Sequence, residues 1–392
     1  MNSTFNPLLS SREALLDWFE TQGTAYPWGD PRREARIDPY KVWISEIMLQ
    51  QTVVSGVLPY FNRWISRFPG VRELAAAEEG EALRYWEGLG YYSRARNLLA
   101  AARKIRDQYG GVLPSRADQL KALPGIGEYT ARAILSLAFN QDLAVLDANV
   151  KRIARRLEGL VELSPAGETA LQTRLDQSLP PGRAGCFNAA LMQFGQKICK
   201  RVPACLRDSS SGGNLGFPDS ESWAPCPLQR NCRAFLEGLV PLIPGARQRM
   251  ITEKAADLAV LLWQNRVFLY PKRRGLGQGL YHLPRKPRPA EVKSSGEPPA
   301  GALPGDLPTW TPGPVLKTRV HTYTRYRETL YPRVYFFPGD PPPLPCGPAG
   351  GEPGFADSGD LGRGGWFTPG EAQKLGFFSV YRQILDEALL SF

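Results

Sequence analysis

Leu123-Pro124-Gly125-Ile126-Gly127-Glu128-Tyr129-Thr130-Ala131 joins two stretches of helical periodicity, 117–123 and 129–139. Glycine permits positive φ angles and lets the backbone approach a ligand closely. A helix that starts after the second glycine presents backbone N–H groups that suit a phosphate. The stretch therefore predicts a helix–hairpin–helix over about 117–139, with Gly125 and Gly127 against a DNA backbone. The alternative is an ordinary tight turn between two helices.

The charge of the chain favours nucleic acid as a partner. Its 392 residues carry a formal net charge of +10, with a pI near 9.3, and such a balance favours an anionic partner. With 43% hydrophobic residues the chain can form buried cores in two or three domains. It contains no apolar run of about 18 residues, so we expect no membrane span. Met1–Ser10 also lacks the basic and apolar parts of a secretory signal.

Helical periodicity continues over most of the chain before about residue 239. Ser10 and Glu13 suggest a capping box at the first helix, and Asp38-Pro39 gives an N-cap followed by proline in the first turn. The remaining stretches with this periodicity are 71–87, 93–109, 148–160, 167–178 and 186–199. We expect a helical domain over residues 1–240.

The pattern changes after a stretch at 241–254 that we interpret as a linker. Asp257–Trp263 and Arg266–Tyr270 alternate like two strands around a Gln264-Asn265 turn. A second hairpin is predicted from 319–326 and 329–337, and a closing helix from 379–390. We therefore expect a mostly α protein whose last domain, over 255–392, is α/β.

Two acidic residues occupy positions that suggest acid–base chemistry. Glu46 shares an apolar helical stripe with Val42, Trp43 and Leu49, and a carboxyl in such a setting holds a proton near neutral pH. Asp147 stands at a helix N-cap, where backbone N–H groups favour the charged form. A proton donor and an anion form the pair that cleaves glycosidic bonds through a cationic sugar. The alternatives are a buried ion pair at Glu46 and a plain helix cap at Asp147.

Four of the six cysteines crowd into one window, with the spacing Cys199-x5-Cys205-x20-Cys226-x5-Cys232. Local crowding of this kind suggests a metal or cluster site more than a disulfide framework. Four thiolates suit a [4Fe–4S] cluster or a structural zinc. Free buried thiols are the third possibility.

A second glycine turn, Gly88-Leu89-Gly90-Tyr91-Tyr92, precedes a basic helix that contains Arg94. A tyrosine on such a turn can wedge into a base stack, and an arginine can hold a phosphate. Alternatively the tyrosines belong to the core and the arginines are solvated. Two interpretations are likewise open for four further basic residues: they bind phosphate, or they form a solvated helix face. These residues are Lys151, Arg152, Arg155 and Arg156.

Four stretches together resemble the A/G-specific adenine DNA glycosylases, the MutY family of the helix–hairpin–helix superfamily. They are WISEIMLQQT at 43–52, GLGYYSRARNL at 88–98, LPGIGEYTA at 123–131 and LDANVKR at 146–152. The resemblance runs over about 15–232 and more weakly from 255 onward. It implies a two-lobed helical glycosylase fold with a [4Fe–4S] cluster lobe. It also implies a monomer in the bacterial cytoplasm, associated with the nucleoid. Such a monomer releases adenine opposite 8-oxoguanine or guanine from double-stranded DNA in base excision repair.

The resemblance also assigns roles to single residues. Glu46 would protonate the adenine ring, Asp147 would stabilise the oxocarbenium-like sugar, and Asn149 would orient Asp147. Tyr91 would wedge beside the mispair, and Trp28 would line the adenine pocket. The strand-intercalating and pocket region would comprise Leu49, Gln50, Gln51 and Thr52.

Tyr129 discriminates between reactions within the superfamily. Relatives that also cut the strand carry a lysine at this position, and its amine forms a Schiff base with the sugar. A phenol cannot do so, and we therefore expect hydrolysis with water as the nucleophile. Tyr129 argues against a bifunctional glycosylase and lyase like endonuclease III. The pair Glu46 and Asp147 argues against a non-catalytic iron–sulfur DNA-binding protein.

The C-terminal part resembles the Nudix-like lesion-recognition domain of the same family, without the Glu-rich metal helix of a Nudix hydrolase. The family's Phe-Ser-His lesion loop reads Tyr323-Thr324-Arg325 here, and with His321 these residues are expected on a short exposed turn. Around the adenine pocket, Thr24, Gly29 and Ala189 replace basic or polar residues that are frequent in the family.

The cysteine spacing departs from the family pattern Cys-x6-Cys-x2-Cys-x5-Cys. The first gap is one residue shorter, and the middle gap holds an 18-residue insert rich in Ser, Gly and Pro. A flexible insert does not prevent four thiolates from converging, because the cost of loop closure grows slowly with length. By resemblance, Cys199, Cys205, Cys226 and Cys232 would bind the cluster.

Overall fold

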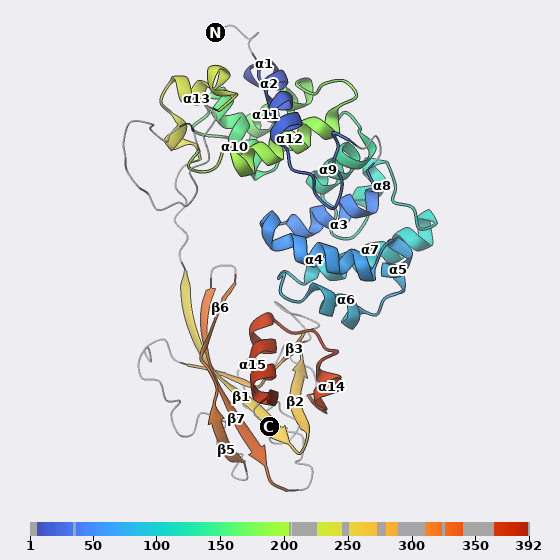
Figure 1. The fold of residues 1–392 in the computed structure, drawn as a ribbon, viewed down its shortest axis with the longest axis vertical. Coiled ribbons are helices and arrows are strands. Elements are labelled where there is room, and N and C mark those ends of the chain that lie inside the picture. Colours follow the sequence, from blue (N-terminus) through green and yellow to red (C-terminus); the bar gives the residue numbers. More distant parts are fainter. Residues whose placement is uncertain are drawn as a thin grey trace. The chain divides into compact units, whose positions relative to one another are not determined.

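The computed structural model describes residues 6–33, 37–203, 205, 226–244, 251–272, 280–288, 310–323, 326–339 and 364–390. Its contacts divide the chain into two compact units (Figure 1). The first comprises 1–72 and 101–247, and the second comprises 73–100 and 248–392. The last cut lies inside the stretch 241–254 that the sequence suggests as a linker. Residues 73–100 differ from expectation, because they group with the C-terminal residues and not with the helical part.

The first unit is helical. Its helices are α1 (Pro7–Ser10), α2 (Arg12–Gln22), α3 (Pro39–Leu49), α4 (Val54–Arg67), α8 (Ala117–Lys121), α9 (Glu128–Phe139), α10 (Ala148–Glu158), α11 (Pro165–Gln177), α12 (Ala184–Lys197) and α13 (Arg233–Leu236). Two 3₁₀ turns, Gln229–Asn231 and Val240–Leu242, flank α13. Helix α5 (Val71–Ala76) and helix α7 (Ser93–Tyr109) cross the boundaries between the units. Among the described residues, no helix is long and apolar enough to span a bilayer.

Helix α3 begins as the sequence predicts. Asp38 is the N-cap, its carboxylate accepts from the N–H of Tyr40 at 2.9 Å, and Pro39 fills the first helical position. The predicted capping box of Ser10 and Glu13 is wrong. Ser10 instead ends the short helix α1, which Asn6 caps.

The predicted stretch 71–87 is two helices, α5 and α6 (Glu79–Trp86). By contrast, the structure confirms the predicted bounds 93–109 of α7. Helix α3 packs against α9, and α12 packs against α2, α9 and α10 (Figure 1). A buried core fills the space between α2, α10 and α12, with the rings of Trp18 and Phe194 meeting edge to face.

The second unit contains a mixed eight-stranded sheet. Its strands are β1 (Thr252–Trp263), β2 (Arg266–Pro271), β3 (Tyr281–His282), β4 (Arg285–Pro287), β5 (Thr311–Val315), β6 (Arg319–Tyr323), β7 (Tyr326–Phe337) and β8 (Gly365–Phe367). The main order is β3-β2-β1-β7-β5, and β4, β6 and β8 pair with β1, β7 and β2. Strands β1 and β7 run parallel over their whole length. Both predicted hairpins are present, although β6 ends and β7 begins three residues earlier than predicted, at Tyr323 and Tyr326.

The sheet buries both of its faces. Alternate residues of β1 point to opposite sides: Leu258 and Val260 face a core with helix α15, whereas Ala259 and Leu261 face a second cluster that includes Trp310. Helix α15 (Ser379–Leu390) has the bounds that the sequence predicts. It follows the short helix α14 (Pro369–Ala372), and the segment between them, 373–378, is central to the contacts described below.

Candidate active site and cysteine-lined pocket

Glu46 is a buried carboxyl at the contact between α3 and α9. It is 6% exposed, and the Tyr129 hydroxyl donates to its Oε2 at 3.2 Å. Burial raises the pKa of Glu46 to about 7, the hydrogen bond from Tyr129 opposes that rise, and the charge of Asp147 adds to it. The structure thus confirms the predicted apolar setting, in which Glu46 holds a proton near neutral pH.

Asp147 is the N-cap of α10, as predicted. Its Oδ1 accepts from the N–H of Val150 at 2.6 Å, and its Oδ2 accepts from Asn149 Nδ2 at 3.0 Å. The backbone donors of the cap favour the anion, as expected, but burial outweighs them and the nearby charge of Arg152 and raises the pKa of Asp147. Three hydrogen bonds and the charge of Arg152 oppose the rise at Asp147, whereas one hydrogen bond opposes it at Glu46.

Asn149 is itself held in place by Arg152. Arg152 Nη2 donates to Asn149 Oδ1 at 3.1 Å and to the carbonyl of Gly195 at 2.7 Å, while its Nε donates to the carbonyl of Cys199 at 2.8 Å. Because Asn149 Oδ1 accepts from Arg152, its amide nitrogen must face Asp147. A Cβ at Gly195 would lie 2.6 Å from the Cβ of Asn149, and this close approach therefore requires glycine. Arg152 is thus an internal support, and neither of the two expectations for it fits.

The segment before Asp147 is fastened by a residue that the sequence analysis did not single out. Asn188 on α12 is 0% exposed, and its Oδ1 accepts from the N–H of Val145 at 2.9 Å. Its Nδ2 donates to the carbonyl of Leu143 at 2.9 Å. Arg132 Nε donates to the carbonyl of Ala144 at 2.8 Å. A buried asparagine among apolar helical residues was the available signal, since such an amide must be hydrogen-bonded.

Trp28 lies in an aromatic group in the first unit. Its ring stacks on Tyr26 at 4.7 Å between centroids and meets Phe61 edge to face at 5.3 Å. The segment leading to it is tied to α12, because the backbone of Thr24 exchanges two 2.8 Å hydrogen bonds with the amide of Gln193. Tyr26, Phe61 and Gln193 are contributors to this site that the sequence analysis missed.

The connection from α3 to α4 carries a backbone that is unusual for its residue type. Gln51 has a φ of 59° and an exposed side chain, and this region costs free energy for a residue other than glycine. Gln50 Nε2 donates to Thr130 Oγ1 at 3.4 Å, and the N–H of Thr52 donates to the carbonyl of Leu49 at 3.1 Å. Val53, next in the chain, is 71% exposed. The turn thus presents both a polar and an apolar side chain.

The predicted hairpin joins α8 to α9. Gly125 has a φ of +80°, which explains the glycine there. Gly127 precedes the first turn of α9 without a side-chain cap, and a Cβ at Gly127 would meet nothing within 4 Å. A cavity of about 340 Å³ lies beside this helix start. It is lined by Glu128, Tyr129, Arg132, Val145, Leu146, Glu168, Thr169 and Gln172.

The turn that carries Tyr91 belongs to the second unit. Tyr91 has a φ of 49°, and the flanking Gly90 has a φ of 77°. Trp86 Nε1 and Arg94 Nη2 both donate to the carbonyl of Gly90, at 2.9 and 3.1 Å. Arg94 is 7% exposed and lies over the rings of Trp86 and Tyr91, at 5.2 and 5.3 Å. The structure therefore places Arg94 as a support of the turn and not, as expected, as an exposed phosphate contact.

The expected lesion-reading loop is described in part. His321 does not lie on an exposed turn, because it is within β6 and its ring packs against Phe378 at 5.3 Å. Burial lowers the pKa of His321. Tyr323 ends β6 opposite Tyr326. Thr324 and Arg325 lie outside the described residues, so the loop tip itself stays a prediction.

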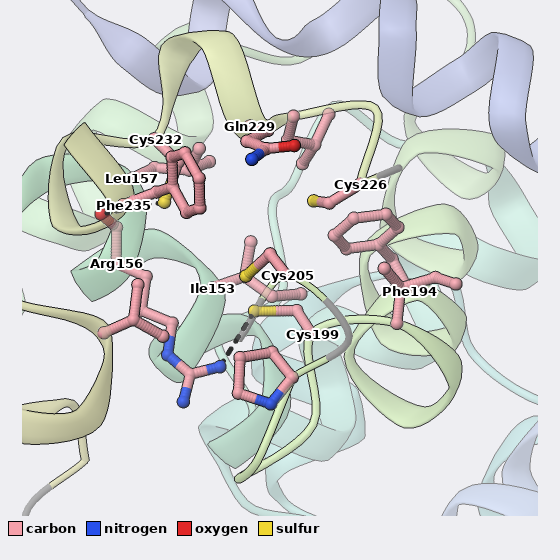
Figure 2. A pocket seen from close by; sticks show the side chains of 14 residues that line it. Ile153, Arg156, Leu157, Phe194, Cys199, Cys205, Cys226, Gln229, Cys232 and Phe235 are labelled. Carbon is pink, nitrogen blue, oxygen red and sulfur yellow. Dashed lines mark hydrogen bonds between the residues drawn. The ribbon is translucent and has the colours of Figure 1, made fainter. Parts of the chain in front are cut away.

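The four predicted cysteines line one pocket in the first unit (Figure 2). Cys199, Cys205, Cys226 and Cys232 line this pocket, whose cavity volume is about 20 Å³, together with apolar side chains such as Phe194. Burial raises the pKa of Cys226 to about 12 and that of Cys232 to about 11. Arg156, whose Nη1 donates to Cys199 Sγ at 3.3 Å, brings a positive charge to the rim.

Among the described residues, no three His, Cys, Asp or Glu side chains meet closely enough to hold one metal ion. The four thiols share one apolar pocket, and four thiolates are the ligands of an iron–sulfur cluster or of a structural zinc.

We expect the buried carboxyl to set a pH dependence of stability. A Glu46 pKa raised from 4.5 to about 7 means that the folded state retains a proton that the unfolded state releases in this pH window. The free energy of unfolding should therefore fall as pH rises from 4.5 to 7, by about 3 kcal/mol from this group. Glu46→Gln should be more stable than the wild type at pH 8 and no more stable at pH 4.

Urea unfolding at several pH values measures this effect. Tyr129→Phe supplies a second arm: loss of its hydrogen bond should raise the Glu46 pKa further, so that the fall in stability still begins near pH 4.5 but becomes larger and extends to higher pH. Equal stability differences between Glu46→Gln and the wild type at pH 4 and pH 8 would contradict the buried, protonated carboxyl.

Comparison with known proteins places this site in a family. Residues 44–177 match the family described as HhH-GPD superfamily base excision DNA repair protein. The chain is 37% identical over 244 residues to the adenine DNA glycosylase of Mus musculus, and this alignment covers 60% of this chain and 44% of that protein. It is 33% identical over 269 residues to that of Buchnera aphidicola subsp. Baizongia pistaciae, which covers 68% of this chain and 70% of that protein. A similar solved structure is a thermostable thymine-DNA glycosylase, with a TM-score of 0.49, 24% identity and coverage of 60% of this chain and 100% of that one.

The extent of these matches differs between relatives. The chain spans less than half the length of the mouse and rat proteins, 44% of each. It spans 70% of the Buchnera protein at 33% identity. The similarity includes α3 and α9, which carry Glu46 and Tyr129, and most of it lies in the part that folds as the helical unit. On these matches, the chain belongs to the adenine DNA glycosylase family.

Proposed function

We propose that this chain hydrolyses the N-glycosidic bond of adenine mispaired with 8-oxoguanine or guanine in double-stranded DNA. The observation that carries the proposal is the juxtaposition of a protonated Glu46, the phenol of Tyr129 and the capped Asp147. The names of the relatives support adenine as the base. The opposing base rests on the sequence resemblance alone.

Glu46 acts as the general acid in this proposal. Its raised pKa keeps a proton available near neutral pH. Transfer of that proton to a ring nitrogen of adenine lets the base leave as a neutral molecule when the bond to the sugar breaks. Adenine must leave the base stack to reach a residue that is 6% exposed, so the mechanism requires base flipping.

Asp147 stabilises the cationic sugar that remains. Asn149 and Arg152 position its carboxylate, and they act as positioning residues because they reach the reacting atoms through Asp147. Water then adds to the sugar and gives up one proton, which restores the acid. Tyr129 has no amine with which to form a Schiff base, and release of adenine should therefore leave an intact strand with an abasic site.

Two turns and a helix start would hold the duplex. Gln51 and Tyr91 both adopt positive φ angles and present side chains that are suited to entering a base stack. The helix start at Gly127 would hold a backbone phosphate. The cavity of about 340 Å³ beside Tyr129 gives water room next to the site.

Residues 255–392 of the second unit are proposed to be a Nudix-like lesion-recognition domain. Its mixed sheet with the parallel pair β1 and β7 and the packed helix α15 supports that assignment. The hairpin of β6 and β7 would bring Tyr323, Thr324 and Arg325 to the base opposite adenine. A monomeric state and a cytoplasmic location stay predictions from the sequence.

A [4Fe–4S] cluster bound by Cys199, Cys205, Cys226 and Cys232 is proposed for the first unit. When bound, it would cross-link the segment after α12 to the segment before α13. Arg152 contacts this region, because its Nε donates a hydrogen bond to the carbonyl of Cys199. The cysteine pocket therefore lies next to Arg152, which positions Asn149 and Asp147. No step of the proposed reaction needs the cluster.

The role of Glu46 is tested by Glu46→Gln, which keeps the volume but cannot donate the proton. We expect adenine release from an A:8-oxoguanine duplex to fall by about 10²- to 10⁴-fold, while duplex binding persists. The matched control is Glu158→Gln, since Glu158 is also 6% exposed but pairs with Arg174 at the end of α10. The control should release adenine at nearly the wild-type rate.

Single-turnover assays with and without hot alkali provide the measurement. Strand breaks should appear only after alkali, because the proposed reaction stops at the abasic site. Adenine release by Glu46→Gln at the wild-type rate would contradict the proposed acid, and strand breaks without alkali would contradict simple hydrolysis.

The cluster is tested by metal analysis of protein purified without oxygen. We expect about four irons per chain and a brown visible absorbance. Cys226→Ser should lose both. Cys186→Ser should keep both, because Cys186 is buried elsewhere and its thiol donates to the carbonyl of Pro31 at 2.8 Å. Zinc in place of iron, or full iron content in Cys226→Ser, would refute the assignment.

A further inference from the structure

The residue after Tyr91 ties the turn to the end of the chain. Tyr92 is 4% exposed, and its hydroxyl donates to the carbonyl of Phe377 at 2.8 Å. The same hydroxyl accepts from the N–H of Gly88 at 3.3 Å. One phenol therefore bridges the first glycine of the turn and the segment between α14 and α15.

An ion pair reinforces this bridge. Arg382 on α15 donates to both carboxylate oxygens of Glu87, at 3.1 and 3.3 Å, and the N–H of Phe377 also donates to Glu87 at 3.4 Å. The two charged side chains are 17% and 14% exposed, which places this pair well below the surface. A Cβ at Gly376 would lie 3.3 Å from the Cβ of Leu83, so the segment also approaches α6 closely.

The same segment contacts the strand that leads to the expected lesion loop. The ring of Phe378 lies 5.5 Å from that of Tyr92 and 5.3 Å from that of His321, measured between centroids. His321 is two residues before Tyr323 at the end of β6. Phe377 and Phe378 thus connect the turn that bears Tyr91 with the hairpin of β6 and β7.

We propose that the coupling segment, Gly376–Arg382, joins these two elements so that they act on the mispair as one body. In this account Tyr92 and Arg382 are positioning residues for Tyr91, and they affect the preference for the opposing base without touching it. The inference rests on the proposed function, because it takes Tyr91 as the wedge and the hairpin as the lesion reader.

The backbone of Tyr91 is the physical reason for such an arrangement. A positive φ at a tyrosine persists only where the surrounding structure fixes it. Trp86 and Arg94 fix the turn from its own helices, and Tyr92 fixes it from the C-terminal segment. If the contact with Phe377 weakens, Tyr91 can relax to a conformation that no longer points its ring at the duplex.

The test compares Tyr92→Phe and Arg382→Gln with a control, Glu371→Gln. Glu371 lies on α14, and its carboxylate accepts from the N–H and the hydroxyl of Thr368 at 2.8 and 2.9 Å, so its partner belongs neither to the turn nor to β6. The readout is the ratio of single-turnover adenine release from A:8-oxoguanine to that from A:G. We expect the two coupling variants to lower this ratio about threefold to tenfold, the effect of one lost buried hydrogen bond. The control should leave it unchanged.

Combination with Tyr91→Ala separates coupling from a general loss of structure. If Tyr92 acts through Tyr91, then Tyr92→Phe should lower the ratio no further in a Tyr91→Ala background. Additive effects of the two changes would overturn the proposal. So would an unchanged ratio in both coupling variants.

A readout that needs no excision keeps this inference distinct from the proposed function. In a Glu46→Gln background, a fluorescent base analogue beside 8-oxoguanine should report insertion of Tyr91 when protein binds. The signal should vanish with Tyr91→Ala and decrease with Tyr92→Phe. A full signal with Tyr92→Phe, or no signal in the parent protein, would overturn the coupling. A normal pattern of signals in a protein that releases no adenine would instead contradict the proposed function alone.

Discussion

The desolvated carboxyl of Glu46 is the constraint on which the rest of the first unit depends. A buried carboxyl that ionises near pH 7 opposes folding above that pH, so the surrounding helices must supply the stability that it removes. Helix α3 does so by burying eight of its eleven residues, Tyr40, Val42, Trp43, Ile44, Ser45, Glu46, Ile47 and Met48. Tyr129 then satisfies the carboxyl with one hydrogen bond that is too weak to offset the burial. Because burial outweighs this one hydrogen bond, the pKa of Glu46 stays raised and the carboxyl holds its proton near neutral pH.

Helix α12 organises the remainder of the site through three residues on one helix. Asn188 fastens the segment before Asp147, Gln193 fastens the segment before Trp28, and Gly195 leaves room for Asn149. Each of these contacts is buried or partly buried, and each joins parts of the chain that are far apart in sequence. One helix therefore fixes the relative positions of Asp147 and the aromatic group around Trp28. Arg152 extends this arrangement to the carbonyl of Cys199 at the rim of the cysteine pocket.

Local signals in the sequence predicted the helices and the two carboxyls. The cap at Asp38 and the periodicity of 93–109 and 379–390 gave correct bounds because these elements are set by their own residues. The predicted capping box at Ser10 is wrong because Ser10 belongs to the preceding short helix α1, whose N-cap is Asn6.

The directions of the charged side chains could not be predicted. Whether an arginine points to solvent or into the protein depends on partners elsewhere, and for this reason Arg94 and Arg152 were misjudged as surface groups. The effect of burial on the pKa of Asp147 could not be predicted for the same reason, since a cap is a local feature and burial is not. Residues 73–100 joined the C-terminal unit through Glu87 and Tyr92, whose partners lie 285 or more positions away.

The account makes its most direct claim about the proton on Glu46. Nuclear magnetic resonance of protein labelled with ¹³C at glutamate carboxyls, with the signal assigned by its loss in Glu46→Gln, would follow that proton through a pH titration. We predict a midpoint near 7 for Glu46. A midpoint near 4.5, the ordinary value for a glutamate, would contradict the claim that burial holds a proton ready at this site.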